Sequence, residues 1–294
     1  MKKYLSLLLS VFLLTSYSNA NEVLFFNSDT TVTKSIKNKV SQAHVQYSID
    51  PKFRNFKLIA HRGGICENLY EEYDPRSIKA AIDSGYWMLE IDVRATKDSI
   101  LIVNHHDDLG VTYGLNNQIS KMTFDELSKI RASKGNYPPM SFEEVLQLMK
   151  KSNTKIMVDL KLEQPIVWFN KSINEMLKKY DMLNDAVFLR NDVINLYDGG
   201  KFGFRMSDLD RIQKMVFAGI DVSNKYYLFD HGNRINAEAA RWCQKNNIMV
   251  CASVNFGHYT LEDPTKGAKR DIEHLIQCGL TVFQIDSDFD EFFH

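Results

Sequence analysis

Titratable side chains follow three apolar, strand-like stretches of this chain, at the point where each stretch ends. They lie in the segments Ala60-His61-Arg62-Gly63, Glu90-Ile91-Asp92 and Asn104-His105-His106-Asp107. Charged groups are rarely placed at the ends of buried strands unless a functional site requires them. Two histidines and two carboxylates brought together can hold a divalent cation and transfer protons beside it. The sequence therefore predicts a site that combines a metal ion with acid–base chemistry.

Glu90 and Asp92 are the first candidate metal ligands. They are two residues apart on a predicted strand, so both point to one face, about 6.6 Å apart along the chain. Such carboxylates repel each other and raise each other's pKa unless a cation lies between them. Another predicted strand carries Asp159, a candidate third ligand, and Lys161, a positive charge for a bound anion. The spacing leaves one alternative open, a structural salt bridge to a nearby Arg or Lys.

The ligand atoms indicate which cation to expect. Carboxylate oxygens alone select a hard cation, Mg²⁺ or Ca²⁺, over zinc. If the protein is exported, as the N-terminal residues discussed below indicate, Ca²⁺ is the more available of the two. The residues that alternate with the two acids are expected to point the other way, toward covering helices: Leu89, Ile91 and Val93.

His61 and His105 are the candidate acid–base pair. Each follows a predicted strand, and we expect these strands to be adjacent and to flank the acidic pair. Arg62 offers a two-pronged guanidinium for a phosphate group, where a lysine would offer only a point charge. His106 should point away from His105 if the strand geometry continues there.

Strand-like and helix-like segments alternate from residue 56 onward, which implies parallel strands with crossover helices. No G-x-G-x-x-G loop follows the first strand, and polar residues recur at the ends of several strands, as in barrel enzymes. The sequence therefore predicts an α/β fold, a TIM-type (β/α)8 barrel over residues 56–294 with a short N-terminal extension. Strands are expected at 56–60, 87–93, 100–104, 155–160, 186–190, 214–220, 226–229, 248–254 and 280–285, and helices at 76–84, 124–131, 141–151, 165–180, 234–246 and 268–277.

The first twenty residues have the features of a secretory signal peptide. Lys2 and Lys3 precede a short apolar core, and Ser18-Asn19-Ala20 offers small residues for cleavage. We therefore expect an exported protein, periplasmic or extracellular, in which residues 21–55 form the N-terminal extension. The formal charge of −1 argues against nucleic acid as a partner.

Four cysteines, Cys66, Cys243, Cys251 and Cys278, show no spacing typical of a metal site. A domain of this size can fold without disulfides, so scattered buried thiols are expected. The pattern leaves their pairing open.

The chain resembles the glycerophosphodiester phosphodiesterase family. The family signature, His-Arg-Gly followed by Glu-x-Asp-Val-x-x-Thr-x-Asp and His-Asp, is matched at His61-Arg62-Gly63, from Glu90 to Asp98 and, in part, at His105-His106. The resemblance continues to Asp159-Leu160-Lys161, where the family usually has Glu-x-Lys. The family's Pro-Glu-Asn-Thr segment is disrupted, so that Glu72 or Glu67 becomes a possible supporting residue, and Ala252 stands where a Trp is expected.

The resemblance implies metal-dependent hydrolysis of a small-molecule glycerophosphodiester to sn-glycerol 3-phosphate and an alcohol. A divalent cation on Glu90, Asp92 and Asp159 would neutralise the phosphoryl group, and His61 and His105 would act as general acid and base. Two alternatives remain. One is a phospholipase D of the sphingomyelinase type that acts on lipid at a membrane surface; the other is a non-catalytic secreted protein that binds a phosphodiester. The oligomeric state is not predicted.

Overall fold

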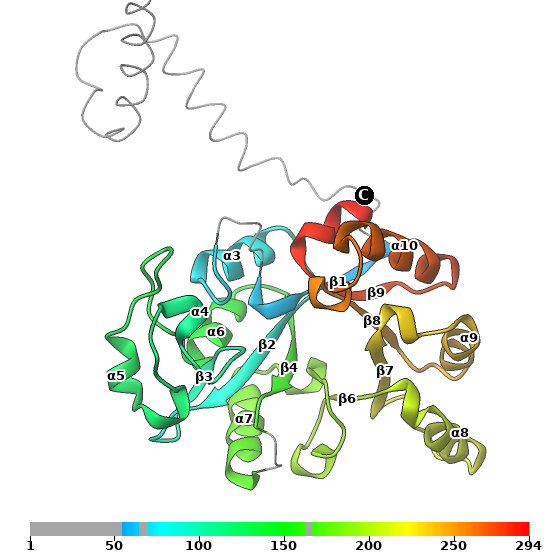
Figure 1. The fold of residues 1–294 in the computed structure, drawn as a ribbon. Helices are drawn as coiled ribbons and strands as arrows, with labels where there is room; N and C mark the ends of the chain where they lie inside the picture. The colour runs from blue at the N-terminus through cyan, green and yellow to red at the C-terminus, as the bar shows by residue number, and fades with distance from the viewer. Residues whose placement is uncertain (1–54, 65–69, 163–165, 294) are drawn as a thin grey trace, which may run out of the picture. The chain divides into compact units, whose positions relative to one another are not determined.

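Within the residues that the computed structural model describes, 55–64, 70–162 and 166–293, eight parallel strands close into a barrel (Figure 1). Closure is completed by β1, which pairs in parallel with β2 on one side and with β9 on the other. The predicted barrel is thereby confirmed. The signal peptide at 1–20, nearly all of the extension at 21–55, and the candidates Cys66 and Glu67 lie outside the described residues. The barrel strands are β1 (Lys57–Ala60), β2 (Met88–Ala95), β4 (Lys155–Leu160), β5 (Val187–Phe188), β6 (Lys201–Phe204), β7 (Tyr226–His231), β8 (Val250–Val254) and β9 (Val282–Ile285).

Helices cover the outside of the barrel (Figure 1). Two of them begin with a capping box, which Thr123 and Ser141 each form with the Glu three residues later, Glu126 and Glu144. These boxes fix where the chain leaves a loop and enters a helix. The helices are α3 (Pro75–Asp83), α4 (Gly110–Tyr113), α5 (Phe124–Ser128), α6 (Phe142–Met149), α7 (Val167–Lys179), α8 (Leu209–Phe217), α9 (Ala237–Lys245) and α10 (Pro264–Gln277).

Side chains of β2 alternate between the barrel interior and the helical layer. Leu89, Ile91 and Val93 are fully buried and belong to the large core between the strands and the helices, as expected. A smaller apolar cluster, which includes Ile59, Met88 and Tyr227, fills the barrel interior. Because successive strand residues face opposite ways, Glu90 and Asp92 lie on the face opposite to Leu89, Ile91 and Val93.

The short strand β3 (Leu101–Val103) runs antiparallel to β2 and lies outside the closed ring. It pairs with β2 at residues 93–95, whereas β1 pairs with β2 at residues 88 and 89. Since β4 pairs along the other edge of β2, β1 and β3 share one edge and leave residues 90–92 between them. The prediction of adjacent strands is therefore corrected: β1 and β3 follow each other along one edge of β2.

One predicted strand is wrong. Residues 214–220 include the end of helix α8. Earlier in this helix Ile212 is fully buried and Leu209 packs against the core. A short apolar run cannot by itself distinguish a strand from the buried stripe of a helix. The missing barrel strand is β6, a four-residue segment whose Gly203 weakened the strand pattern in the sequence.

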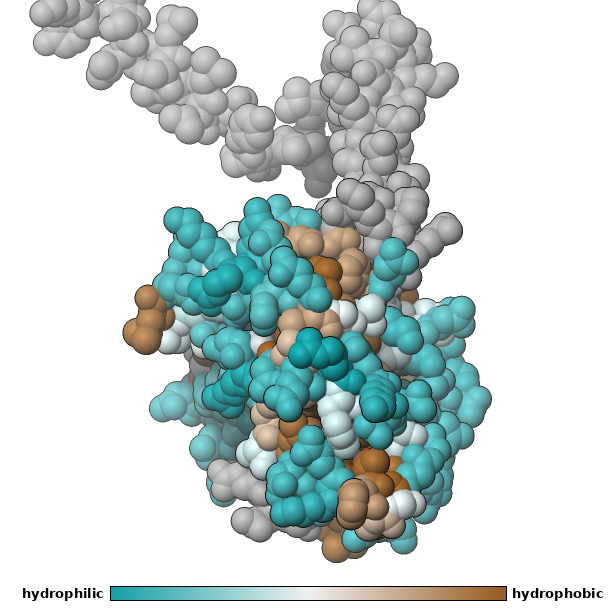
Figure 2. Space-filling view, turned by 90° about the vertical axis from the view of Figure 1, so that its right-hand side faces the viewer, coloured by the Kyte–Doolittle hydropathy of each residue, from teal (hydrophilic) through white to brown (hydrophobic). Residues whose placement is uncertain are grey.

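The surface formed by the right-hand side of Figure 1 is mostly hydrophilic. Figure 2 shows that hydrophobic residues on this face occur in small, separate groups. Among the described residues no helix combines the length and the apolar character that a membrane crossing requires.

Candidate functional site

Three carboxylates from two neighbouring strands converge in the barrel. Asp92 on β2 and Asp159 on β4 are register partners, and Glu90 lies two residues before Asp92. One oxygen from each carboxyl group lies within 4.8 Å of the others, and this is the one cluster of its kind found in the described part of the chain. Glu90 and Asp92 are 1% exposed, so these charges have almost no access to solvent. The structure thus brings together the three residues proposed as metal ligands.

Lys161 only partly compensates this cluster. Its ammonium group lies 2.7 Å from Asp92 Oδ1 and 2.6 Å from Asp159 Oδ2, and the salt bridge considered as an alternative therefore exists. Three carboxylates and one ammonium leave two negative charges uncompensated. Burial, together with the charges of Asp92 and Asp159, raises the pKa of Glu90 well above its usual range. A divalent oxygen-seeking cation fits this donor set in charge and in ligand type.

Tyr73 forms hydrogen bonds with Asp92 of the cluster and was not anticipated from the sequence. Its buried hydroxyl donates a hydrogen bond to Asp92 Oδ2 and accepts one from the backbone N–H of Asp92. The backbone of Tyr73 is left-handed, with φ of 59°, a conformation that costs energy for a bulky residue. No motif in the sequence marks a tyrosine for this position, because its reach depends on the turn that carries it.

His61 is held by Asp286, which sequence analysis did not assign to the site. His61 Nδ1 lies 2.6 Å from Asp286 Oδ1, and Asn255 Nδ2 is 3.4 Å from Nε2 on the other side of the ring. Burial raises the pKa of Asp286, but the hydrogen bond and the charge of His61 outweigh it, so the net pKa is lowered. An ionised Asp286 fixes the Nδ1–H tautomer of His61 and leaves Nε2 to face the site. The available signal was position: Asp286 directly follows the last barrel strand.

His105 has a different environment. Its Nε2 lies 3.2 Å from Arg62 Nη2, and its backbone carbonyl accepts a 2.6 Å hydrogen bond from Arg94. Burial lowers the pKa of His105 to about 3, and the charges of Lys161 and Arg62 act in the same direction, against Asp92. His105 is therefore neutral in this state.

His106 was expected to point away from His105 only if strand geometry continued, and that condition is not met. His105 Nδ1 and His106 Nε2 are 3.1 Å apart, and the ring centroids lie 4.4 Å apart. The strand alternation assumed for this segment does not apply, because β3 ends at Val103 and the chain bends immediately afterwards.

Arg62 contacts both His105 and the carboxylate cluster. Its backbone N–H donates to Glu90 Oε2 at 2.8 Å, and its guanidinium forms an ion pair with Glu72, one of the two possible supporting residues. The backbone has φ of 50°, in the left-handed region. The buried Nε–H of Arg62 has no partner among the described residues, and neither does Asn255 Oδ1. Unpaired buried polar atoms that face a site are available to a ligand.

A cavity of about 780 Å³ opens beside His61 at the ends of the strands. Its size lies within the range of small-molecule sites, about 300 to 1,000 Å³. The lining includes both signs of charge and aromatic rings, among them Arg62, Tyr70, Glu72, Lys134, Asn255, Phe256, His258, Asp286 and Asp288.

The cysteines described by the structure take no part in this site. Cys243 and Cys251 are buried free thiols, and Cys278 is a partly exposed one. Burial raises the pKa of Cys243 to about 12. The expectation of scattered buried thiols is confirmed for Cys243 and Cys251, whereas Cys278 is free but partly exposed.

Residues 61–249 match the model of the Glycerophosphoryl diester phosphodiesterase family. The human protein named lysophospholipase D GDPD1 is 32% identical over 138 residues, which cover 42% of this chain and 42% of that protein. The glycerophosphodiester phosphodiesterase of Bacillus altitudinis is 30% identical over 129 residues, 42% of this chain and 51% of its own length. The chain thus spans about half the length of these curated relatives.

Solved structures show the same fold. A glycerophosphoryl diester phosphodiesterase from Parabacteroides distasonis has a TM-score of 0.64 at 18% identity, covering 82% of this chain and 90% of its own. A phosphodiesterase from Oleispira antarctica, solved with the product sn-glycerol-3-phosphate, has a TM-score of 0.63 at 18% identity, covering 82% and 98%.

Proposed function

Because this chain belongs to the glycerophosphoryl diester phosphodiesterase family, we propose that it hydrolyses glycerophosphodiesters to sn-glycerol 3-phosphate and an alcohol. The observation that carries the proposal is the arrangement along β2. His61 and His105 follow strands that pair along one edge of β2, and the buried carboxylate cluster between them could hold a cation. Acid–base groups and metal ligands are the two components that phosphodiester hydrolysis needs.

Glu90, Asp92 and Asp159 would hold the divalent cation, Mg²⁺ or Ca²⁺. When bound, it supplies positive charge to the phosphoryl oxygens in the transition state. Arg62, through its unpaired Nε–H, and Lys161 add donors for the same oxygens. Glu72 forms an ion pair with the guanidinium of Arg62 and helps to hold it in place.

His61 and His105 carry the protons. One imidazole takes a proton from the attacking oxygen, and the other gives a proton to the leaving alcohol. Asp286 orients His61 through Nδ1, and Arg94 holds the backbone of His105. Both histidines are thereby contacted by groups outside the carboxylate cluster.

The direct test is release of sn-glycerol 3-phosphate from glycerophosphocholine, measured with a coupled dehydrogenase. We expect release by the full chain, loss of release with EDTA, and recovery when Mg²⁺ or Ca²⁺ is added back; the ion that restores more activity identifies the preferred cation. Absence of chelator-sensitive release from any glycerophosphodiester would instead support a protein that only binds a phosphodiester. The intact carboxylate cluster and both histidines argue against that alternative.

A second candidate substrate is lipid. Several relatives that match this chain bear the name lysophospholipase D, which favours testing a lysophospholipid and sphingomyelin beside the soluble diester. Preference for the lipid, measured as kcat/KM at equal concentrations, would assign a phospholipase D activity at a membrane surface.

We also propose that the protein is exported, on the basis of the signal-peptide features of residues 1–20. N-terminal sequencing of the protein recovered outside the cytoplasm should begin at Asn21. A mature protein that retains Lys2 and Lys3 would overturn the predicted cleavage.

A further inference from the structure

A second cavity lies at the opposite end of the barrel from the carboxylate cluster. It has a volume of about 440 Å³ and is lined by the first residue of seven of the eight barrel strands, among them Lys57, Met88, Lys155, Lys201, Val250 and Val282. The carboxylates and His61 lie toward the other ends of these strands. Between the two cavities the interior is filled by an apolar layer that includes Met157, Tyr227 and Phe229. The second cavity is therefore separate from the proposed active site.

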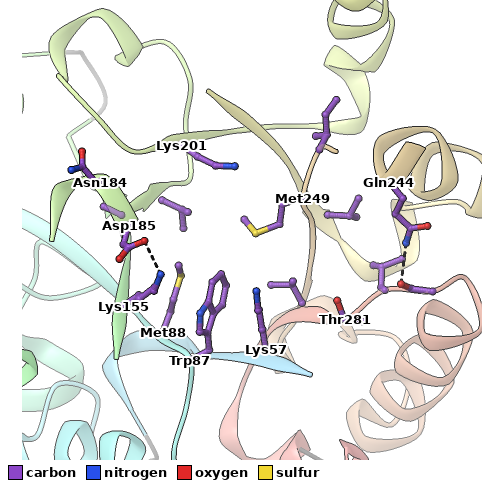
Figure 3. A pocket seen from close by; sticks show the side chains of 17 residues that line it. Lys57, Trp87, Met88, Lys155, Asn184, Asp185, Lys201, Gln244, Met249 and Thr281 are labelled. Atoms are coloured by element: carbon purple, nitrogen blue, oxygen red, sulfur yellow. Dashed lines mark hydrogen bonds and ion pairs between the residues drawn. The ribbon is translucent and has the colours of Figure 1, made fainter. Parts of the chain in front are cut away.

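The walls of this cavity combine apolar surface with positive charge. Trp87 and Met249 are only partly buried there, and Lys57 and Lys201 reach toward the opening from opposite sides (Figure 3). Lys155 is the third lysine, and it is paired with Asp185 at 2.6 Å.

The other two lysines keep their charge available. Lys57 lies over the ring of Trp87, with Nζ 4.8 Å from the centroid, and Lys201 donates one hydrogen bond to the carbonyl of Ser223 at 2.8 Å. Within the part of the chain that the structure describes, neither forms an ion pair with a carboxylate.

The N-terminal end of such a barrel ordinarily serves stability, and lysines at a surface are commonly just solvated. Here three features together depart from that expectation. The cavity is large enough for a small molecule, its floor is apolar, and two of its three lysines, Lys57 and Lys201, form no ion pair with any carboxylate that the structure describes. Apolar walls with a few charged groups are typical of sites for small organic ligands.

We propose that this cavity binds an organic anion, with an apolar body against Trp87, Met88 and Met249 and a carboxylate or phosphate head group between Lys57 and Lys201. Lysines act as point charges and do not require the planar geometry that an arginine would select, so either head group satisfies them. The inference is independent of the hydrolytic activity, since none of these residues lines the cavity beside His61.

Octanoate, octylphosphonate and the neutral octanamide are suitable probes, because they share one apolar tail and differ in the head group. Binding can be followed by the fluorescence of Trp87 in the full chain carrying Trp168→Phe and Trp242→Phe, which leaves Trp87 as the single tryptophan. We expect at least one anion to bind about tenfold or more tightly than octanamide. The anion with the higher affinity identifies the preferred head group.

Lys57→Met with Lys201→Met should weaken anion binding about tenfold and leave octanamide binding unchanged. The matched control is Lys269→Met, an exposed lysine on α10 outside the cavity, which should change neither. Equal affinity of the single-tryptophan protein for anions and amide, or no response of its Trp87 to either anion at about 1 mM, would overturn the proposal. The comparison of ligands uses the protein in which both lysines are present, so it stands even if the lysine variants do not fold.

Discussion

The imidazoles of His61 and His105 are held by groups of opposite charge. Asp286 accepts from the Nδ1–H of His61, whereas Arg62 faces Nε2 of His105. Burial, together with the charges of Lys161 and Arg62, lowers the pKa of His105, whereas the hydrogen bond to Asp286 fixes the orientation of His61. The two rings therefore have different partners, which suits two different proton-transfer roles.

His61→Ala and His105→Ala should each lower kcat about 100- to 10,000-fold, the range that a positioned acid or base contributes. Both rings are partly exposed, so the fold should be preserved. Turnover of glycerophosphocholine and far-UV circular dichroism would be measured together. His274→Ala, on the exposed surface of α10, is the control and should keep wild-type turnover. Near-wild-type rates in either site variant would refute its role.

Asp286→Asn should lower kcat about 100-fold or more, toward the roughly 10⁴-fold loss known when the carboxylate of a His–Asp pair is replaced by an amide. The amide can donate to Nδ1, which turns the wrong tautomer of His61 toward the substrate. KM should change little, because Asp286 acts through His61. Asp288→Asn is the matched control: it is exposed, lines the same cavity and makes no contact with His61. Equal losses in both variants would show that only the charge of the cavity matters.

At the scale of elements, the turn after β1 helps to position the carboxylate cluster through Tyr73. Gly63 has φ of 80° and lies against the ring of Tyr73, where an added Cβ would come 2.8 Å from Cδ1. Tyr73 in turn holds Asp92 by a hydrogen bond. The backbone of one glycine therefore controls the position of a proposed metal ligand 29 residues further along the chain.

Gly63→Ala should destabilise the protein by about 1 to 3 kcal/mol and also lower activity, because Tyr73 must move. Gly219→Ala is a matched control: φ is 81°, and no atom lies within 4 Å of the added Cβ. It carries the same backbone cost without the collision. Urea unfolding gives the free energies, and the same preparations give kcat. If both variants keep full activity, the contact between Gly63 and Tyr73 does not contribute to catalysis.

At the scale of the whole molecule, the barrel holds a cluster of acidic side chains in its interior. The closed sheet places three carboxylates side by side with a single ammonium, and mutual repulsion there opposes folding. A bound divalent cation relieves that repulsion. Folding stability and cation binding should therefore be linked.

Saturating the protein with Mg²⁺ or Ca²⁺ at a concentration about 100 times Kd should stabilise it by about 2.7 kcal/mol, measured as an increase in Tm over the EDTA-treated protein. In Glu90→Gln the increase should shrink, because a ligand charge is lost, while the EDTA-treated variant should melt above the EDTA-treated wild type. Asp125→Asn removes an exposed acid of α5 and should leave the cation effect unchanged. An equal Tm increase in all three proteins would place the cation elsewhere.

The sequence by itself determined the alternation of strands and helices, the two capping boxes and the candidate ligands Glu90, Asp92 and Asp159. These features depend on local spacing, such as two residues for one face of a strand and three for a capping box. Local spacing failed where it is ambiguous. The apolar run at 214–220 predicted a strand, although part of it forms the end of a helix.

Only the tertiary structure decided which groups meet. Asp286 lies 225 residues from His61 in the chain, and the ring closure that pairs β1 with β9 brings them together. The contact of Tyr73 with Asp92, and the placement of Lys161 on two carboxylates, likewise follow from how strands are paired and turns are bent. Periodicity fixes the direction of a side chain along its own strand, but the partner across the barrel is fixed by closure and register.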